Sequence, residues 1–143
     1  MALSAKIEYG IISLLELGSI HGQGGVLQVG AIARRQGIPD RYLEQMLTSL
    51  RRAKILRSIR GPKGGYQLAR PPADIRITEV IDALEGDRSG PPGGQRDTPE
   101  YTVLISLAER LEQARRAVLE ASTLQDLLDQ RDQLAQAQAM YFI

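Results

Sequence analysis

Basic side chains gather in one part of the sequence, residues 28–70. This segment holds ten Lys and Arg residues but only two acidic ones, a net charge of +8, although the whole chain carries only +1. A local excess of positive charge is the chemistry that binds a polyanion such as nucleic acid, whereas the simpler interpretation is a solvated basic surface. Its concentration in one contiguous segment favours the polyanion interpretation.

Within this segment, the stretch SIRGPKGGYQLARPP (58–72) combines glycines with basic residues and could cradle a phosphate. A nucleotide-binding loop ends in Gly-Lys-Ser/Thr and opens a helix, so that backbone amides and the lysine meet the phosphates. Here Lys63 precedes two glycines and the following residues favour a strand, which excludes a nucleotide loop. A flexible linker is excluded as well, because the segment has an apolar side to bury. That side consists of Ile55, Ile59, Tyr66 and Leu68.

Catalytic and metal-binding chemistry finds little support in this composition. The chain has no cysteine, so it offers no thiolate for zinc or an iron–sulfur cluster. Its single histidine, His21, stands in a glycine-rich stretch without a nucleophile–base arrangement. We therefore predict a protein that is not an enzyme and has no cofactor. No apolar run approaches the roughly 20 residues that span a bilayer, and the first residues lack a signal-peptide pattern, which predicts a cytoplasmic protein without a membrane partner.

Two short helices separated by a tight turn are predicted over residues 29–36 and 39–53. Gly37 can adopt the left-handed conformation that turns the chain, and small Ala33 lets the second helix pack closely across the first. The second helix has an apolar stripe, formed by Leu43, Met46, Leu47 and Leu50. This is the helix-turn-helix pattern, in which the second helix can enter the major groove of DNA. A helical hairpin without a DNA-binding role is the alternative, since any such hairpin needs a small residue and a turn glycine.

A β-hairpin is predicted directly after these helices, with strands in residues 55–60 and 66–70 and the GPKGG loop between them. A hairpin in this place is the wing of a winged-helix domain. Its glycines would let the loop run close to a sugar-phosphate backbone, and Arg60 and Lys63 supply charge there. Arg60 could enter a minor groove. The predicted DNA-binding wing therefore includes Gly64 and Gly65 together with these two cations.

The C-terminal part is predicted to be helical beyond a Gly- and Pro-rich flexible loop at residues 87–99. From Glu100 onward, apolar side chains recur at alternating steps of three and four, a heptad seam. The seam consists of Leu104, Leu107, Leu111, Ala114, Val118 and Ala121. It could pack within its own domain, or it could join two copies of the chain, as a palindromic DNA site requires. The last residues, QAMYFI, are apolar enough to dock on the domain or on a partner subunit.

These elements together predict a mainly α-helical protein with one small β-hairpin, an α+β fold. Helices over residues 3–19 and about 74–86 would flank the helix-turn-helix and its wing. The expected organisation is a winged helix-turn-helix DNA-binding domain in residues 1–86, the flexible loop in 87–99, and a helical dimerisation region with the apolar tail in 100–143.

Three stretches resemble the Rrf-two family of bacterial winged-helix transcription regulators: SAKIEYGIISLLELG, IARRQGIPDRYLEQMLTSLRRAKILRSIRGPKGGYQLARPP and ITEVIDALEG. The resemblance covers residues 2–86 closely, and YLEQ…LR with RGPKGGY is its most specific part. It implies a homodimer that binds a palindromic DNA operator, with the long helix from about residue 100 crossing to the partner.

The resemblance also assigns DNA contacts by position. The start of the second helix would meet base edges and phosphates through Arg41, Tyr42, Glu44 and Gln45, and Arg60 would enter the minor groove. The side-chain chemistry agrees in part, since Gln45 can pair with adenine and Glu44 can accept a hydrogen bond from cytosine. Phosphate contacts or general electrostatics are the better interpretation for Arg51, Lys54 and Lys63. Tyr42 could equally be a core residue.

One departure from the family pattern changes the expected cofactor. Family members that bind an iron–sulfur cluster have three cysteines after the wing helix, and residues 87–99 here contain none. The stretches AVLEASTLQDLLDQ and AMYFI resemble the cluster-free subgroup of cysteine-metabolism repressors (CymR), in which a complex with cysteine synthase delivers the signal.

The sequence therefore predicts a homodimeric, cluster-free, sequence-specific DNA-binding regulator. We expect a repressor that controls sulfur or cysteine metabolism, with cysteine synthase as a candidate partner. The alternatives are a winged-helix module that binds protein and a regulator of another stress or metabolic pathway, because such folds are reused.

Overall fold

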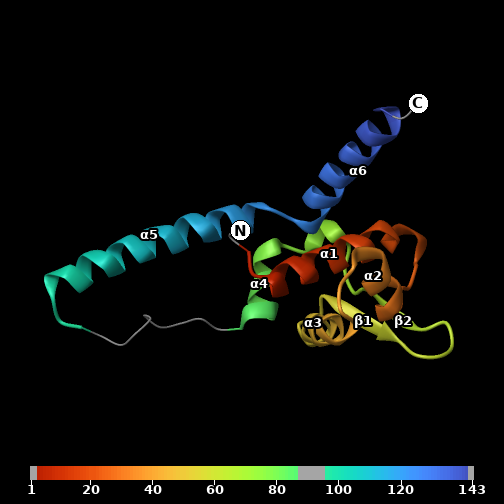
Figure 1. The fold of residues 1–143 in the computed structure, drawn as a ribbon, viewed down its shortest axis with the longest axis horizontal. Coiled ribbons are helices and arrows are strands. Elements are labelled where there is room, and N and C mark those ends of the chain that lie inside the picture. Colours follow the sequence, from red (N-terminus) through yellow and green to blue (C-terminus); the bar gives the residue numbers. More distant parts are fainter. Residues whose placement is uncertain (1–2, 87–95, 142–143) are drawn as a thin grey trace.

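The computed structural model describes residues 3–86 and 96–141, which fold mostly into helices with a short two-stranded sheet (Figure 1). In chain order the elements are α1 (Ala5–Ser19), η1 (His21–Gln23), α2 (Val29–Gln36), α3 (Asp40–Arg52), β1 (Leu56–Ile59), β2 (Gly65–Leu68), η2 (Pro72–Asp74), α4 (Ile77–Glu85), α5 (Pro99–Ala121) and α6 (Leu124–Tyr141). The predicted mainly helical fold with a small hairpin is confirmed. Within the described ranges, no helix is long and apolar enough to cross a membrane.

Helices α1, α2 and α3 pack together as the predicted helix-turn-helix with a preceding helix. The Ser4 hydroxyl accepts a hydrogen bond from the Ile7 amide at 3.3 Å and so caps α1. Gly37 ends α2 at φ 67°, the left-handed conformation expected of this turn. The apolar stripe of α3 is at most 2% exposed and consists of Leu43, Met46, Leu47 and Leu50. Burial of these side chains, worth about 1.5–3 kcal/mol each, fixes which face of α3 points outward.

The hairpin forms as predicted and is anchored by a third segment that the sequence pattern did not indicate. Strands β1 and β2 are antiparallel, and their pairing ends at Ile59 opposite Gly65. Leu27, in the connection between α1 and α2, makes two backbone hydrogen bonds with Tyr66 of β2, with N–O distances of 3.0 and 2.8 Å. The wing is therefore tied to the helices by backbone bonds as well as by side-chain packing.

The apolar side of the hairpin packs on the helices with one exception. Ile55, Leu56 and Leu68 are buried, and Tyr66 is half-buried. Ile59, which was expected on the same apolar side, is 37% exposed, so this part of the prediction is wrong. The reason is its place at the outer end of the ladder, where the hairpin extends beyond the helices (Figure 1).

Helix α5 begins one residue earlier than predicted. The Thr98 hydroxyl accepts a hydrogen bond from the Tyr101 amide at 3.1 Å, and Pro99 stands in the first turn, where its missing N–H needs no partner. Most of the predicted flexible loop, residues 87–95, lies outside the described residues. Its last residues, 96–98, precede the helix.

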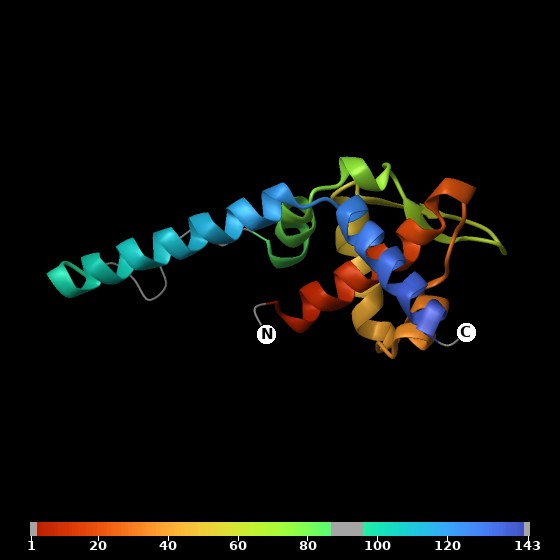
Figure 2. The same ribbon diagram turned by 90° about the horizontal axis from the view of Figure 1, so that it is seen from above.

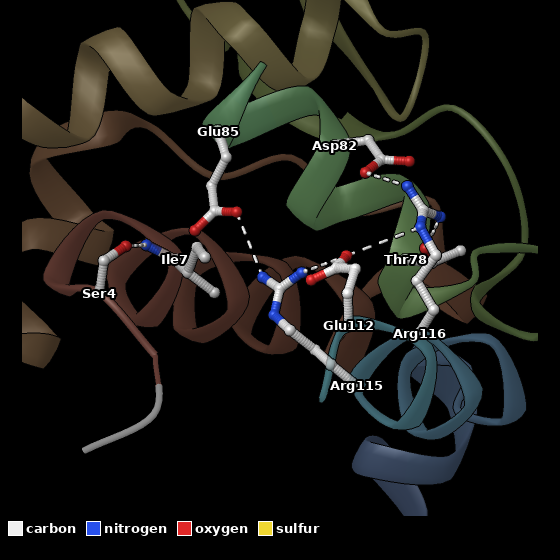
Figure 3. Close-up of polar contacts among 8 residues, drawn as sticks. All are labelled: Ser4, Ile7, Thr78, Asp82, Glu85, Glu112, Arg115 and Arg116. Atoms are coloured by element: carbon white, nitrogen blue, oxygen red, sulfur yellow. Dashed lines mark hydrogen bonds and ion pairs between the residues drawn. The ribbon is translucent and has the colours of Figure 1, made fainter. Parts of the chain in front are cut away.

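The C-terminal half of α5 is fastened to α4 by ion pairs (Figure 3). Arg115 pairs with Glu85 at 3.2 Å, and Arg116 pairs with Asp82 at 3.5 Å. Glu112 lies near both arginines, at 3.5 Å from Arg115 and 3.8 Å from Arg116. The N-terminal half of α5 extends away from the rest of the molecule as an arm (Figure 1).

Helix α6 returns to the winged-helix part and completes its core. The Ile77 amide donates to the Ser122 carbonyl at 2.9 Å, and the Leu124 amide donates to the Ile75 carbonyl at 2.8 Å. Leu124 and Leu128 are buried in the main core, where α6 lies across α1 (Figure 2). The hydrophobic core therefore includes side chains from both sides of residue 86. The division into residues 1–86 and 100–143 stays a prediction about function and is not a boundary of this core.

The described part of the apolar tail is exposed in the folded chain. Met140 and Tyr141 are exposed at the end of α6, and residues 142–143 lie outside the described residues. Docking on the chain's own domain is thus wrong for the side chain of Met140. Docking on a partner subunit stays a prediction.

Candidate nucleic-acid interface

The outward face of α3 brings together three of the four residues predicted to meet bases. A shallow depression of about 610 Å³ runs along this face and is lined by Arg41, Glu44, Gln45, Thr48, Ser49 and Arg52. These positions are three or four residues apart, so they stack on one side of the helix. Tyr42 does not line the depression, but it is 58% exposed, which rules out its interpretation as a core residue.

Thr48, Ser49 and Arg52 belong to this face although sequence reasoning did not select them. The Thr48 hydroxyl donates to the carbonyl oxygen of Glu44 at 2.8 Å, and the Ser49 hydroxyl donates to that of Gln45 at 3.2 Å. Each hydroxyl oxygen keeps its lone pairs free as acceptors. Helical spacing was the signal that could have found them, because Thr48 and Ser49 stand one turn beyond Glu44 and Gln45.

The wing tip, residues 60–64, presents both predicted cations at the surface. Arg60 and Lys63 are exposed on the two sides of the turn. Gly61 has a φ of 108°, a conformation that residues with a side chain rarely adopt. This conformation favours glycine at position 61, in the turn that separates the two exposed cations.

Gly64 and Gly65 are explained by contacts inside the domain. A Cβ atom at Gly64 would overlap the carbonyl oxygen of Ile59, and one at Gly65 would overlap the carbonyl group of Leu27. Gly64 is buried and Gly65 is half-buried. Their glycine identity thus follows from close packing of the wing on its own backbone, and contact with DNA at these two positions stays a prediction.

The cations of α3 and the wing form no ion pair with an acidic side chain among the described residues. In residues 3–86 and 96–141, no ion pair involves Arg41, Arg51, Arg52, Lys54, Arg60 or Lys63, all of which are exposed. Other arginines of the basic segment are used within the fold, since Arg35 pairs with Glu16 at 2.8 Å. The unpaired cations lie on α3 and the adjoining hairpin, on the side of the molecule opposite α6 (Figure 1). This arrangement can neutralise phosphates on either side of a DNA groove.

The predicted heptad seam of α5 faces solvent. Between 46% and 67% of the surface is exposed at Leu104, Leu107, Leu111 and Val118, and Ala114 is exposed as well. The interpretation that this seam packs within its own domain is therefore wrong for these residues. Their use in dimerisation stays a prediction.

Comparisons with known proteins agree with this geometry. The model of the Rrf2 (Rrf-two) family, described as iron-dependent transcriptional regulators, matches residues 3–130. Slr0846 of Synechocystis sp., named as an HTH-type transcriptional regulator, is 39% identical over 147 residues, which cover 100% of this chain and 99% of that protein. The HTH-type transcriptional regulator CymR of Bacillus subtilis is 33% identical over 141 residues, 99% of each chain.

Two solved structures are similar over most of their length. IscR of T. potens superposes with a TM-score of 0.77 at 34% identity, covering 92% of this chain and 88% of that one. CymR of B. subtilis, described as the global cysteine regulator, superposes with a TM-score of 0.75 at 33% identity, covering 90% and 97%. Both likenesses span at least nine-tenths of this chain.

The donor set of this chain does not fit an iron–sulfur cluster. Such clusters are held by cysteine thiolates, sometimes with histidines, and this sequence has no cysteine and one histidine. Among the described residues, no group of three or more His, Asp or Glu side chains is placed to hold a metal ion. The sequence therefore lacks the thiolate ligands by which proteins hold such a cluster.

The function class follows from the geometry and the comparisons together. An outward polar face on α3, an exposed cationic wing and unpaired arginines are the parts of a winged-helix DNA reader. The relatives are transcription regulators rather than enzymes. Since the family model matches nearly the whole chain and full-length relatives exceed 30% identity, this protein belongs to the Rrf2 family of DNA-binding transcription regulators.

Proposed function

We propose that the protein is a homodimer that binds a palindromic DNA operator and represses transcription without an iron–sulfur cluster. One observation carries this proposal: α3 and the wing tip both carry exposed cations that form no ion pair among the described residues, and α3 and the hairpin lie on one side of the molecule (Figure 1). Two such surfaces related by a twofold axis would read the two halves of a palindrome.

The exposed seam of α5 supports the dimer. Monomeric proteins rarely expose contiguous apolar surface, and here large apolar side chains follow one another along a single helix side. A helix of 23 residues is about 35 Å long, comparable to the roughly 34 Å between half-sites one turn apart on DNA. Pairing of two α5 helices through Leu104, Leu107, Leu111, Ala114 and Val118 would bury this surface and set the distance between the two α3 helices.

The proposed contacts divide into base readout and backbone positioning. Gln45 would pair with adenine and Glu44 would accept from cytosine, each worth about 1–3 kcal/mol of discrimination. Arg60 would enter the minor groove beside the half-site. Phosphates would be held by the remaining positions, with the wing backbone close to the sugar-phosphate chain: Arg41, Tyr42, Arg51, Lys54, Lys63, Gly64 and Gly65.

Control of sulfur or cysteine metabolism is the pathway we propose. Two observations support it: full-length similarity to the B. subtilis protein described as the global cysteine regulator, and a sequence without the thiolates that a cluster requires. Cysteine synthase is the proposed partner. The exposed Met140 near the end of α6 would be available for such a contact.

Selection of binding sites from random duplex DNA tests the proposal, with and without cysteine synthase from the same source. We expect the parent protein to enrich a palindrome, and the Gln45→Ala variant to lose the preference for adenine at one position of each half-site. If the enzyme changes the recovery of that palindrome, the cysteine pathway is supported. An unchanged recovery contradicts the partner, and enrichment of no sequence contradicts the proposed operator binding.

A further inference from the structure

A small cavity lies where the winged-helix part of the molecule meets α6. Its volume is about 270 Å³, just below the roughly 300 Å³ at which the range for drug-sized ligand sites begins. The end of α1 with η1 forms one wall, Pro72 of η2 forms a second, and one side of α6 forms the third. It lies across the core from α3, so the DNA-binding surface described above does not account for it.

Arg131 of α6 lines this cavity with most of its donors unused. Its Nη1 donates to the Ser19 hydroxyl oxygen at 2.7 Å. The Ser19 hydroxyl itself donates to the Leu15 carbonyl at 2.8 Å, so its oxygen is oriented to accept from the guanidinium. In the part of the chain that the structure describes, Nε and Nη2 of Arg131 have no acceptor. A guanidinium fixed at one nitrogen with further N–H donors free suits a carboxylate.

Asp132 supplies the opposite charge in the same cavity. Its Oδ1 lies 3.4 Å from Arg131 Nη1, and this contact is the only ion pair of Asp132 among the described residues. The side chains of Arg131 and Asp132 are 41% and 61% exposed, so both can be reached by a solute. Buried Leu128 provides an apolar floor beside them. A cation and an anion side by side over an apolar floor match a solute that carries both charges and a small side chain.

We propose that this cavity binds a small zwitterion of the α-amino-acid type. Its carboxylate pairs with the free donors of Arg131, and its ammonium group pairs with Asp132. The cavity volume suits a molecule of this size, and the side chain of the ligand would rest on Leu128 near His21.

The walls of the cavity connect it to both working parts of the regulator. Pro72 comes after the second strand of the wing in the chain. Arg131 and Asp132 stand on α6, which comes after the α5 arm. Backbone hydrogen bonds between residues 75–77 and 122–124 join the segment after the wing to the start of α6. A ligand that contacts all three walls would favour one arrangement of the wing, α5 and α6 over others. Because coupling between two binding sites is reciprocal, a ligand that changes the affinity for DNA is itself bound more or less tightly when DNA is present. The expected effect on operator affinity rests on the proposed function, whereas ligand binding itself does not.

His21 makes the binding test direct, because it is the only histidine of the chain and it lines the cavity. Its imidazole C–H signals in an NMR spectrum therefore report on this site alone. The probes are the standard amino acids added one at a time, followed by the des-amino acid and the amide of the one that binds. We expect a saturable shift with the amino acid, and binding about tenfold or more weaker with either single-charge analogue, since each loses a hydrogen bond to a charged group.

Two variants and one control decide the assignment. Arg131→Gln and Asp132→Asn should each weaken the binding of the amino acid about tenfold or more. The control is Arg96→Gln, which replaces an exposed arginine just before α5 and should leave the affinity unchanged. No saturable shift with any amino acid, or equal binding by Arg131→Gln, overturns the site. Binding with no change in the affinity for a selected operator overturns the regulatory role alone, and failure to select an operator bears only on the proposed function.

Discussion

At the residue scale, the cationic side chains and the glycines of the wing have different roles. Arg60 and Lys63 are exposed and unpaired within the described residues, so their charge is available to DNA. Gly64 and Gly65 face the backbone of the domain instead. In the proposed complex the two cations would act on the DNA, whereas the glycines shape the element that presents the cations.

Replacing the two wing cations should give different signatures. Lys63→Ala should weaken binding to all DNA sequences alike. It should also reduce the slope of log affinity against log salt concentration by about 2 for the dimer, because each of the two lost phosphate contacts removes about 0.9. Arg60→Ala should cost about 1–3 kcal/mol and depend on the A·T content beside the half-site. Titrations of labelled operators at several salt concentrations measure both, with Arg96→Ala as the control cation. Identical curves for Arg60→Ala and the parent would contradict groove insertion.

Gly65→Ala should destabilise the fold by about 1–3 kcal/mol, because the new Cβ atom meets the backbone of Leu27 and cannot displace it easily. Gly22→Ala is the matched control, since no atom lies within 4 Å of its Cβ position. Urea unfolding followed by circular dichroism compares the two variants with the parent. Equal unfolding midpoints for both variants would show that the wing adjusts without cost.

At the element scale, α6 has a buried part and an exposed part along its length. Its first turns carry Leu124 and Leu128 into the main core, and its remainder is exposed. Since the backbone bonds of residues 122–124 also hold the segment after the wing, α6 is a structural part of the DNA-binding half. The helix thus connects the core to whatever its exposed end contacts.

Two leucines of α6 test this division. Leu128→Ala should lower the free energy of unfolding by about 2–5 kcal/mol, because it leaves a cavity in the core. Leu134→Ala, on the same helix but 60% exposed, should change it by about 0.5 kcal/mol or less. Chemical denaturation of both variants provides the comparison. Similar losses for the two would mean that the exposed part of α6 is also packed in solution.

At the scale of the whole molecule, α5 would decide how two copies meet in the proposed dimer. Its C-terminal half is fixed to α4 by the arginine pairs, so a partner bound to its N-terminal half is held at a set distance from α3 (Figure 3). These surface ion pairs contribute only about 0–1 kcal/mol each to stability. Their larger effect is to fix the direction of the arm.

Leu111→Asp should dissociate the dimer, because it places a charge in the middle of the exposed seam. Gln113→Asp introduces the same charge on a different side of the same helix and should leave the dimer intact. Light scattering coupled to size-exclusion chromatography measures the mass of each variant. An unchanged dimer mass for Leu111→Asp, and likewise for Leu107→Asp, would contradict the seam.

The sequence by itself determined the local elements and the chemistry of the site. Helical periodicity, the turn at Gly37 and the GPKGG loop are short-range signals, so they predicted α2, α3 and the hairpin within one or two residues. The excess of cations and the absence of cysteine are properties of composition, which no fold can alter. On the outward side of α3, the residues of the first turns were predicted through the family resemblance, whereas Thr48, Ser49 and Arg52 were identified only in the structure.

Only the tertiary structure decided which distant segments meet. The bond between Leu27 and Tyr66, the burial of Leu128, and the exposure of Ile59 all depend on contacts between residues far apart in the chain. Sequence periodicity shows that a face is apolar but does not show what covers it. For that reason the α5 seam could be interpreted in two ways from the sequence, and its exposure in the folded chain removed one of them.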